Sequence, residues 1–239
     1  MILDIQRAIR NTAAGQTTFF DTAAFPWVKH VEAMWPNIHA EANRVLAAID
    51  TLPGYEQIQE DQAALSTDRR WKIFPFDAYG HNVPVNHALC PVTSYALSLI
   101  PGYKAGMFSI LQGGKHLPAH YGPYNGVLRY HLGVTVPEPE KCGLTIGFET
   151  RRWYEGQSMI FDDSFLHSAS NMSDKDRVVL FVDFERNDLD DELAATNKYV
   201  IDQIGQSYFI THAVANWLKW EEAHGQELIQ RVMSAGDTE

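Results

Sequence analysis

The stretch VLRYHLGVTV, residues 127–136, carries the pattern that decides the fold. It is rich in β-branched and aromatic residues, which favour strands. Five further stretches share this composition and are separated by turn signals such as Gly113-Gly114 and Glu155-Gly156. They are WKIFPF (71–76), MFSILQ (107–112), GLTIGFE (143–149), SMIFDD (158–163) and VVLFVDF (178–184). Many short strands at such spacing predict an antiparallel sandwich or barrel.

Helical patterns flank this β region on both sides. After Pro36, apolar residues repeat at spacings of three and four through Ile49, as in a helix that ends at Pro53-Gly54. Acidic residues open one expected helix after residue 187, and a second runs from about 208 to 233. A helix over 91–100 is expected within the β region. We therefore predict a single domain over 1–239, with a helical part (1–70), a β core (71–186) and a second helical part (187–239).

Charge and apolar patterning narrow the class of protein. Thirty acidic residues against 19 basic ones give a net charge of −11, which argues against a nucleic-acid partner or an anionic membrane surface. Charges interrupt the apolar N-terminal stretches, and Pro91 breaks the longest apolar tract, so neither a signal peptide nor membrane insertion is expected. Cys90 and Cys142 are too few for a disulfide framework. We expect reduced thiols and a cytoplasmic location.

Two histidines stand where a barrel could bring them together. His120 lies at the end of an expected strand after a glycine-rich turn, and His167 lies at a comparable strand boundary much later in the chain. Metal sites in β-barrels take ligands from distant strands, and imidazole is a common ligand. The same pattern also fits two hydrogen-bonded structural histidines.

Arg177 begins the apolar strand that follows these histidines. An arginine facing into a barrel must meet an anion, because a buried unpaired guanidinium has lost its hydration. Its planar fork can bind a carboxylate through two parallel hydrogen bonds. An exposed arginine at a strand edge, paired with Asp174 or Asp176, fits the same periodicity.

Three longer motifs resemble the aspartyl/asparaginyl β-hydroxylase family. They are HYGPYNGVLRYHLGV (120–134), ETRRWYEGQSMIFDDSFLH (149–167) and DRVVLFVDFER (176–186), and WK at 71–72 with MFSILQGG at 107–114 is similar to earlier blocks of that family. The likeness keeps its order and spacing over roughly half the chain. It implies a mostly β fold with flanking helices and a double-stranded β-helix (jelly-roll) core. It also implies a hydroxylase that uses iron(II), 2-oxoglutarate and dioxygen.

The resemblance assigns roles to individual positions. His120 and His167 match the two metal ligands of the family. Arg177 matches the residue that binds the distal carboxylate of 2-oxoglutarate, and Ser109 matches the residue that assists it. Arg129 and His131 match residues near the keto-acid end of the cosubstrate.

One position departs from the usual iron site. Most non-haem iron oxygenases use two histidines and one carboxylate. The carboxylate normally stands two residues after the first histidine, where this chain has Gly122. Animal members of the family also have glycine there, so the resemblance implies that water takes this place. Asp163 could orient that water or His167, or it could stabilise the turn in FDDS.

The acceptor is the least determined part of the expected reaction. Animal peptidyl hydroxylases carry an arginine near the substrate carboxylate at the position of Val127. The blocks GPYNG and LRYHLG are also similar to bacterial lipid A 2-hydroxylases, which have a membrane-anchoring segment not recognised here. We expect a small-molecule or peptide acceptor of amino-acid type, with acyl-chain hydroxylation as the alternative. Four aromatic residues could shape its pocket or belong to the core: Phe74, Tyr124, Tyr130 and Trp153.

Two other classes of protein fit parts of the pattern. A cupin-like enzyme that binds a metal without 2-oxoglutarate would need further protein ligands, for which His116 is a candidate if it faces inward. A non-catalytic binding or sensory barrel would keep only the fold. The histidine pair together with Arg177 favours the hydroxylase.

Overall fold

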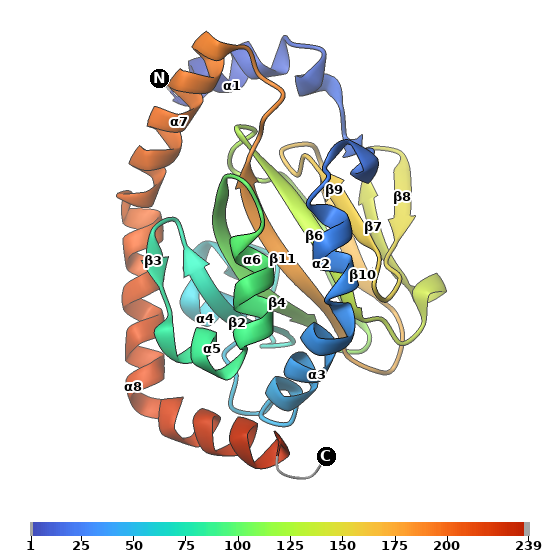
Figure 1. Cartoon of the computed structure of the whole chain (residues 1–239), viewed down its shortest axis with the longest axis vertical. Coiled ribbons are helices and arrows are strands. Elements are labelled where there is room, and N and C mark those ends of the chain that lie inside the picture. Colours follow the sequence, from blue (N-terminus) through green and yellow to red (C-terminus); the bar gives the residue numbers. More distant parts are fainter. Residues whose placement is uncertain (1, 237–239) are drawn as a thin grey trace.

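A computed structural model describes residues 2–236. Their strands form two antiparallel sheets that face each other, as expected for a double-stranded β-helix core (Figure 1). The large sheet has the order β1 (Phe19–Phe20), β9 (Ser158–Phe161), β6 (Val127–Thr135), β11 (Arg177–Glu185), β4 (Tyr103–Leu111), β2 (Trp71–Ala78) and β3 (His81–Asn82). The small sheet has the order β5 (Lys115–His120), β10 (His167–Asn171), β7 (Cys142–Ile146) and β8 (Glu149–Arg152).

The two faces of the large sheet have different chemistry, because successive strand residues point to opposite sides. In β6, Leu128 and Tyr130 belong to the main apolar core on one side of the sheet. Helices α2 (Val28–Ala33), α3 (Trp35–Leu46) and α6 (Pro91–Ser98) contribute to that core and cover that side. Arg129 and His131 alternate with these apolar residues and face the small sheet. Arg129 and His131 thus place polar groups in the space between the two sheets.

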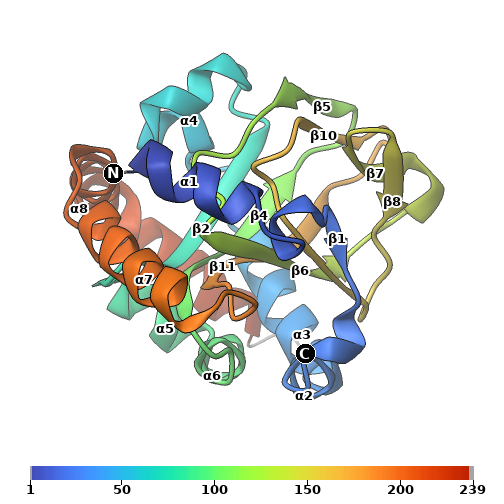
Figure 2. The ribbon, with the colours of Figure 1, turned by 90° about the horizontal axis from the view of Figure 1, so that it is seen from above.

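The remaining helices lie around the barrel. They are α1 (Ile2–Arg10), α4 (Tyr55–Ile58), α5 (Pro84–Leu89), α7 (Asp191–Gly205) and α8 (Tyr208–Gly236). Asp190 caps α7 by accepting a hydrogen bond from the Leu193 N–H, as expected for a helix that begins in an acidic run. Figure 2 shows α1 crossing above the strand ends beside α7. None of the helices within residues 2–236 has the length and apolarity needed to cross a bilayer.

Two local expectations need correction, and one further short helix was not predicted. The part expected to be helical, 1–70, contains β1, which pairs with β9 at the sheet edge. Two residues are too few to show a strand pattern in sequence, although Phe19 packs against the Phe161 ring at 6.1 Å between centroids. Helix α3 ends at Leu46, and turns lead from there to Pro53. The helix expected over 91–100 is present as α6 but follows a second short helix, α5.

Candidate active site

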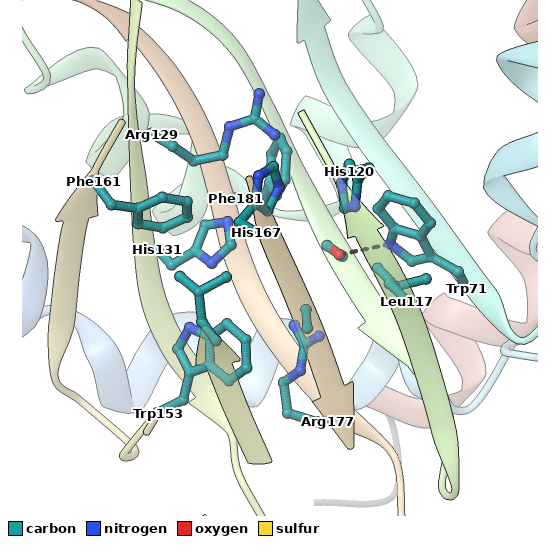
Figure 3. A pocket seen from close by; sticks show the side chains of 13 residues that line it. Trp71, Leu117, His120, Arg129, His131, Trp153, Phe161, His167, Arg177 and Phe181 are labelled. Atoms are coloured by element: carbon teal, nitrogen blue, oxygen red, sulfur yellow. Dashed lines mark hydrogen bonds between the residues drawn. The ribbon is translucent and has the colours of Figure 1, made fainter. Parts of the chain in front are cut away.

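A cavity lies between the two sheets (Figure 3). It brings together six residues that the sequence singled out: Ser109, His120, Arg129, His131, His167 and Arg177. Apolar residues complete its wall: Trp71, Leu117, Leu144, Trp153, Phe161, Ala169 and Phe181. Residues from both sheets therefore converge on one space.

The histidine pair forms a preorganised nitrogen site. His120 ends β5 and His167 begins β10, and the two residues are direct partners with ring centroids 4.1 Å apart. His120 Nδ1 lies 2.8 Å from the Pro118 carbonyl, and His167 Nδ1 lies 3.0 Å from the Phe165 carbonyl. A carbonyl only accepts, so each Nδ1 carries the proton and each Nε2 keeps its lone pair. This is the tautomer in which both Nε2 atoms can bind a metal.

Burial keeps these imidazoles in the metal-binding form. Loss of hydration lowers the pKa of both His120 and His167, so both rings are neutral near pH 7. In residues 2–236, no three or more His, Cys, Asp or Glu side chains are grouped so that they could hold a metal. His116 is exposed on β5 and does not line the cavity. The third ligand considered for a cupin-like enzyme is therefore not in the site.

Asp163 occupies the space that a side chain at position 122 would need. A Cβ atom on Gly122 would lie 2.3 Å from Asp163 Cγ. Asp163 is 3% exposed, and its Oδ2 lies 2.9 Å from Arg129 Nη2. The turn-stabilising role considered for Asp163 belongs instead to Asp162, which accepts from the Ser164 N–H at 2.9 Å. Gly122 thus admits a carboxylate that comes from another part of the chain.

Arg129 lies between two carboxylates at one end of the cavity. Its Nε lies 2.9 Å from Asp183 Oδ1, in addition to its contact with Asp163. Its guanidinium stacks over the Phe181 ring at 4.1 Å, and Tyr79 donates to Asp183 at 3.1 Å. Although burial opposes it, Asp163 and Asp183 raise the pKa of Arg129, which stays charged. Sequence reasoning missed Asp183, although it lies an even number of residues after Arg177 on β11 and therefore points to the same face of the sheet.

Arg177 lies at the opposite end of the cavity, as Figure 3 shows. It is 2% exposed, and its Nε and Nη1 atoms have no hydrogen-bond partner. The guanidinium carbon lies 4.5 Å from the centre of the Trp153 ring. Burial lowers the pKa of Arg177 to about 10. The alternative of an exposed arginine paired with Asp174 or Asp176 is therefore wrong.

Ser109 and His131 add neutral polar groups to the cavity wall. Ser109 lies opposite Val179, so it shares the face of Arg177 on the neighbouring strand, and its hydroxyl accepts from Trp71 Nε1 at 3.0 Å. Neither ring nitrogen of the buried His131 has a partner. Burial, together with Arg129 and Arg177, holds the pKa of His131 well below its ordinary value. Its ring is therefore neutral and has one free donor and one free acceptor.

Of the four aromatic pocket candidates, only Trp153 lines the cavity. Phe74 and Tyr130 belong to the main core on the helix-covered face of the large sheet. Tyr124 packs elsewhere with Ile5 and donates to the Asn197 side chain at 2.6 Å. Composition does not separate these four residues, because the side that a strand residue faces depends on how its strand pairs.

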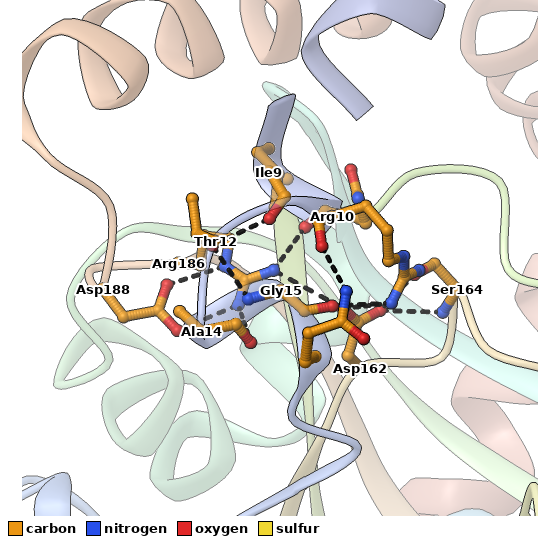
Figure 4. A network of polar contacts seen from close by, with 12 residues as sticks. Ile9, Arg10, Thr12, Ala14, Gly15, Asp162, Ser164, Arg186 and Asp188 are labelled. Carbon is orange, nitrogen blue, oxygen red and sulfur yellow. Dashed lines mark hydrogen bonds and ion pairs between the residues drawn. The ribbon is translucent and has the colours of Figure 1, made fainter. Parts of the chain in front are cut away.

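A buried polar network fixes the loops that carry the histidines (Figure 4). Arg186 donates to the Asn125 carbonyl at 2.9 Å, in the loop after His120, and its Nη1 lies 3.5 Å from Asp162 Oδ2, before His167. It also binds the Ala14 carbonyl at 3.1 Å and Asp188 through both carboxylate oxygens. One guanidinium thereby connects both ligand loops to the N-terminal segment.

We expect Arg186→Met to lower the free energy of unfolding by about 3–5 kcal/mol, because it leaves the buried Asp162 with only the more distant Arg10 guanidinium, at 4.0 Å, as a cationic partner. Burial already raises the pKa of Asp162 even with Arg186 present. Equilibrium urea unfolding measures the change. The matched control is Arg7→Met on exposed α1, where the expected change is within about 0.5 kcal/mol. Equal loss in both variants would contradict this account of the network.

Comparison with known proteins gives the family. The sequence model of the family described as "Aspartyl/Asparaginyl beta-hydroxylase" matches residues 32–187. The chain belongs to this family. Membership places it among hydroxylases and confirms the resemblance seen in the sequence motifs.

Individual members of the aspartyl/asparaginyl β-hydroxylase family differ in how much of the chain they match. An ornithine lipid ester-linked acyl 2-hydroxylase from Rhizobium tropici is 42% identical over 209 residues, which cover 87% of this chain and 74% of that protein. Human aspartyl/asparaginyl beta-hydroxylase is 32% identical over 164 residues, 65% of this chain and 20% of the human protein. Mouse aspartate beta-hydroxylase domain-containing protein 2 is 37% identical over 122 residues, 47% of this chain and 35% of that protein.

The chain thus spans about a fifth of the human relative and a third of the mouse relative. Solved structures similar to the chain include a Cupin 2 conserved barrel domain protein from Salinispora arenicola. It is 11% identical, with a TM-score of 0.33, over 59% of this chain and 92% of that one.

Proposed function

We propose that the chain is an iron(II)- and 2-oxoglutarate-dependent hydroxylase. The observation that carries the proposal is the buried, unpartnered guanidinium of Arg177 in the same cavity as two histidines with free Nε2 atoms. A buried cation without a partner is unfavourable unless an anion joins it. A keto acid with a carboxylate at its far end supplies that anion and can also reach a metal.

The donor set fits both groups. His120 and His167 would hold iron(II) through Nε2 and leave other coordination positions free. Arg177 and the Ser109 hydroxyl would hold the distal carboxylate of 2-oxoglutarate, and His131 lies between Arg177 and Arg129 in the cavity (Figure 3). Bound iron(II) supplies, with dioxygen and 2-oxoglutarate, the oxidising power for hydroxylation, with succinate and carbon dioxide as products.

The protein's own contribution is position and exclusion of water. The Pro118 and Phe165 carbonyls hold the Nδ1 protons and so fix both ring orientations. Arg129 holds the Asp163 carboxylate in place beside Gly122, near the end of β5. Trp71, Phe161 and Phe181 form apolar walls that limit water in the cavity. Small displacements of such groups cost heavily in rate.

We further propose that the acceptor is the acyl chain of a lipid. The Rhizobium tropici relative, described as a lipid acyl 2-hydroxylase, matches most of this chain. Val127 is 4% exposed and packs with Ile5 and Ile9, so the arginine that peptidyl hydroxylases carry there has no counterpart. An amino-acid-type acceptor, our expectation from sequence, is the second candidate, favoured by the match to the human relative. A cytoplasmic location remains part of the proposal.

Anaerobic addition of iron(II) and 2-oxoglutarate tests the cofactor assignment. We expect a weak visible charge-transfer band, because the two histidines would hold iron(II) and Arg177 would hold the 2-oxoglutarate that binds to it. Succinate release with acyl lipids, acidic peptides and free amino acids then tests the acceptor, and we expect acyl lipids to stimulate it most. Absence of the band would contradict the 2-oxoglutarate assignment. Succinate release stimulated only by peptides or amino acids would favour the amino-acid-type acceptor over the lipid.

A further inference from the structure

Four large apolar side chains are exposed at one end of the small sheet. They are Leu3 (72% exposed), Tyr121 (67%), Phe148 (108%) and Leu166 (43%). We call them the apolar rim. They come from four separate segments of the chain, so no single amphipathic pattern in the sequence predicts them. Single exposed apolar residues are ordinary, but a group gathered at one place marks an interaction surface.

Strand topology places three rim residues beside the histidine pair. His120 ends β5, His167 begins β10 and is the partner of Ile146, which ends β7. The segments that carry Tyr121, Leu166 and Phe148 therefore leave the same end of the small sheet. Gly147 has φ +58° and donates its N–H to the Leu166 carbonyl at 2.9 Å. That tight turn presents Phe148 fully to solvent and joins it to Leu166.

Helix α1 brings Leu3 to the same end. Gln6 donates to the Pro123 carbonyl at 2.8 Å, and Asn125 donates to the Gln6 carbonyl at 2.9 Å. Arg10 reaches the Ser164 hydroxyl in the turn before His167, as Figure 4 shows. Leu3 is one helical turn before Gln6, on the same side of α1. Figure 2 shows α1 lying across this end of the barrel.

The rim lies at the end of the small sheet that carries the histidine pair. Arg177, Ser109 and His131 are nearly inaccessible, whereas His120, at the end of β5, is only partly buried. Solvent therefore reaches the cavity from the side on which the rim lies. An acceptor that enters from this side passes the rim on its way to the histidines.

We propose that the apolar rim docks the protein on a lipid bilayer by shallow insertion of its side chains. The inference rests on the proposed acyl-chain acceptor, because such a chain can then pass from the bilayer into the cavity without crossing water. Each apolar side chain moved from water into the bilayer contributes favourably. The net charge of −11 argues against general attraction to anionic headgroups. The preferred surface is therefore zwitterionic, and binding depends on apolar contact.

Co-sedimentation with phosphatidylcholine vesicles, without iron or 2-oxoglutarate, tests this surface. The wild-type chain should bind, and high salt should change the binding little. Replacing two rim residues that are remote from the metal ligands, in the double variant Leu3→Ser/Phe148→Ser, should weaken binding at least about tenfold. The matched control removes two exposed apolar residues from α8, Leu218→Ser/Met233→Ser, and should bind like wild type.

Each other outcome overturns the proposal. Absence of vesicle binding, or equal binding by wild type and the rim variant, removes the bilayer as partner. Binding only to phosphatidylglycerol vesicles, abolished by salt, assigns the contact to charge. A dimer in sedimentation velocity that the rim variant dissociates assigns the surface to a second copy of the chain. The anaerobic charge-transfer band of the rim variant separates these failures from failure of the proposed function, because that band needs no vesicle.

Discussion

Arg177→Met is expected to weaken 2-oxoglutarate binding about a hundredfold while iron(II) binding is retained. Loss of one partner from a buried charge pair costs about 2–5 kcal/mol, and each 1.4 kcal/mol is a factor of ten. Methionine fills similar volume, and no carboxylate of the free protein loses its partner, because Arg177 Nε and Nη1 are unpaired. The measurement is an anaerobic titration of the iron(II)-loaded variant with 2-oxoglutarate, followed through the charge-transfer band.

Arg151→Met is the control for this variant. Arg151 is half-buried on β8, where it pairs with Glu149 at 2.7 Å and lies over the Phe19 ring, and it does not line the cavity. Its replacement should leave the titration midpoint unchanged. If Arg177→Met binds 2-oxoglutarate as tightly as the wild-type chain, the cosubstrate carboxylate does not meet this guanidinium.

His167→Ala is expected to lower iron(II) affinity by more than roughly a hundredfold, since changes to groups that only support a metal ligand already cost 10–100-fold. The described residues offer no third protein ligand that could compensate. Both the charge-transfer band and succinate release should disappear. Iron content after anaerobic gel filtration, measured alongside the band, reports the loss directly.

The same sheet provides a matched control. His116 lies on β5, four residues before His120, but it is exposed and does not line the cavity. His116→Ala should keep its iron and its band. Iron bound stoichiometrically to the His167→Ala variant would show that the metal lies elsewhere, and the histidine pair would then be structural.

Much of the fold followed from composition, because strand-forming stretches and turn signals depend on local sequence. The stretches around 127–136 and 178–184 became β6 and β11, the central strands of the large sheet. Phe19–Phe20 escaped prediction because a two-residue strand exists only through its pairing with β9. The end of α3 was predicted at Pro53-Gly54, but the helix ends at Leu46 and turns follow it before the proline is reached.

The site was predictable in part. His120, His167 and Arg177 stood out through residue type and position, whereas Ser109, Arg129 and His131 entered through family resemblance alone; the structure gathers all six. Their roles as ligands remain predictions. The full cavity wall could not be derived from composition, because Trp153 and Tyr130 are both large aromatic residues of the β region. Only the folded structure shows that Trp153 lines the cavity and that Tyr130 lies in the core. Asp183 was missed although its even spacing from Arg177 along β11 places both residues on the same face.

The contact between Gly122 and Asp163 also bears on how such sites can change. The room beside the histidines admits one acid, and this chain supplies it from the turn before β10. An aspartate introduced after β5 would fit only if Asp163 were replaced by a smaller residue. That replacement would leave Arg129 with only one of its two carboxylate partners, Asp183. The two positions are interlocked, so conversion between a two-histidine centre and one with a directly bound carboxylate takes paired substitutions.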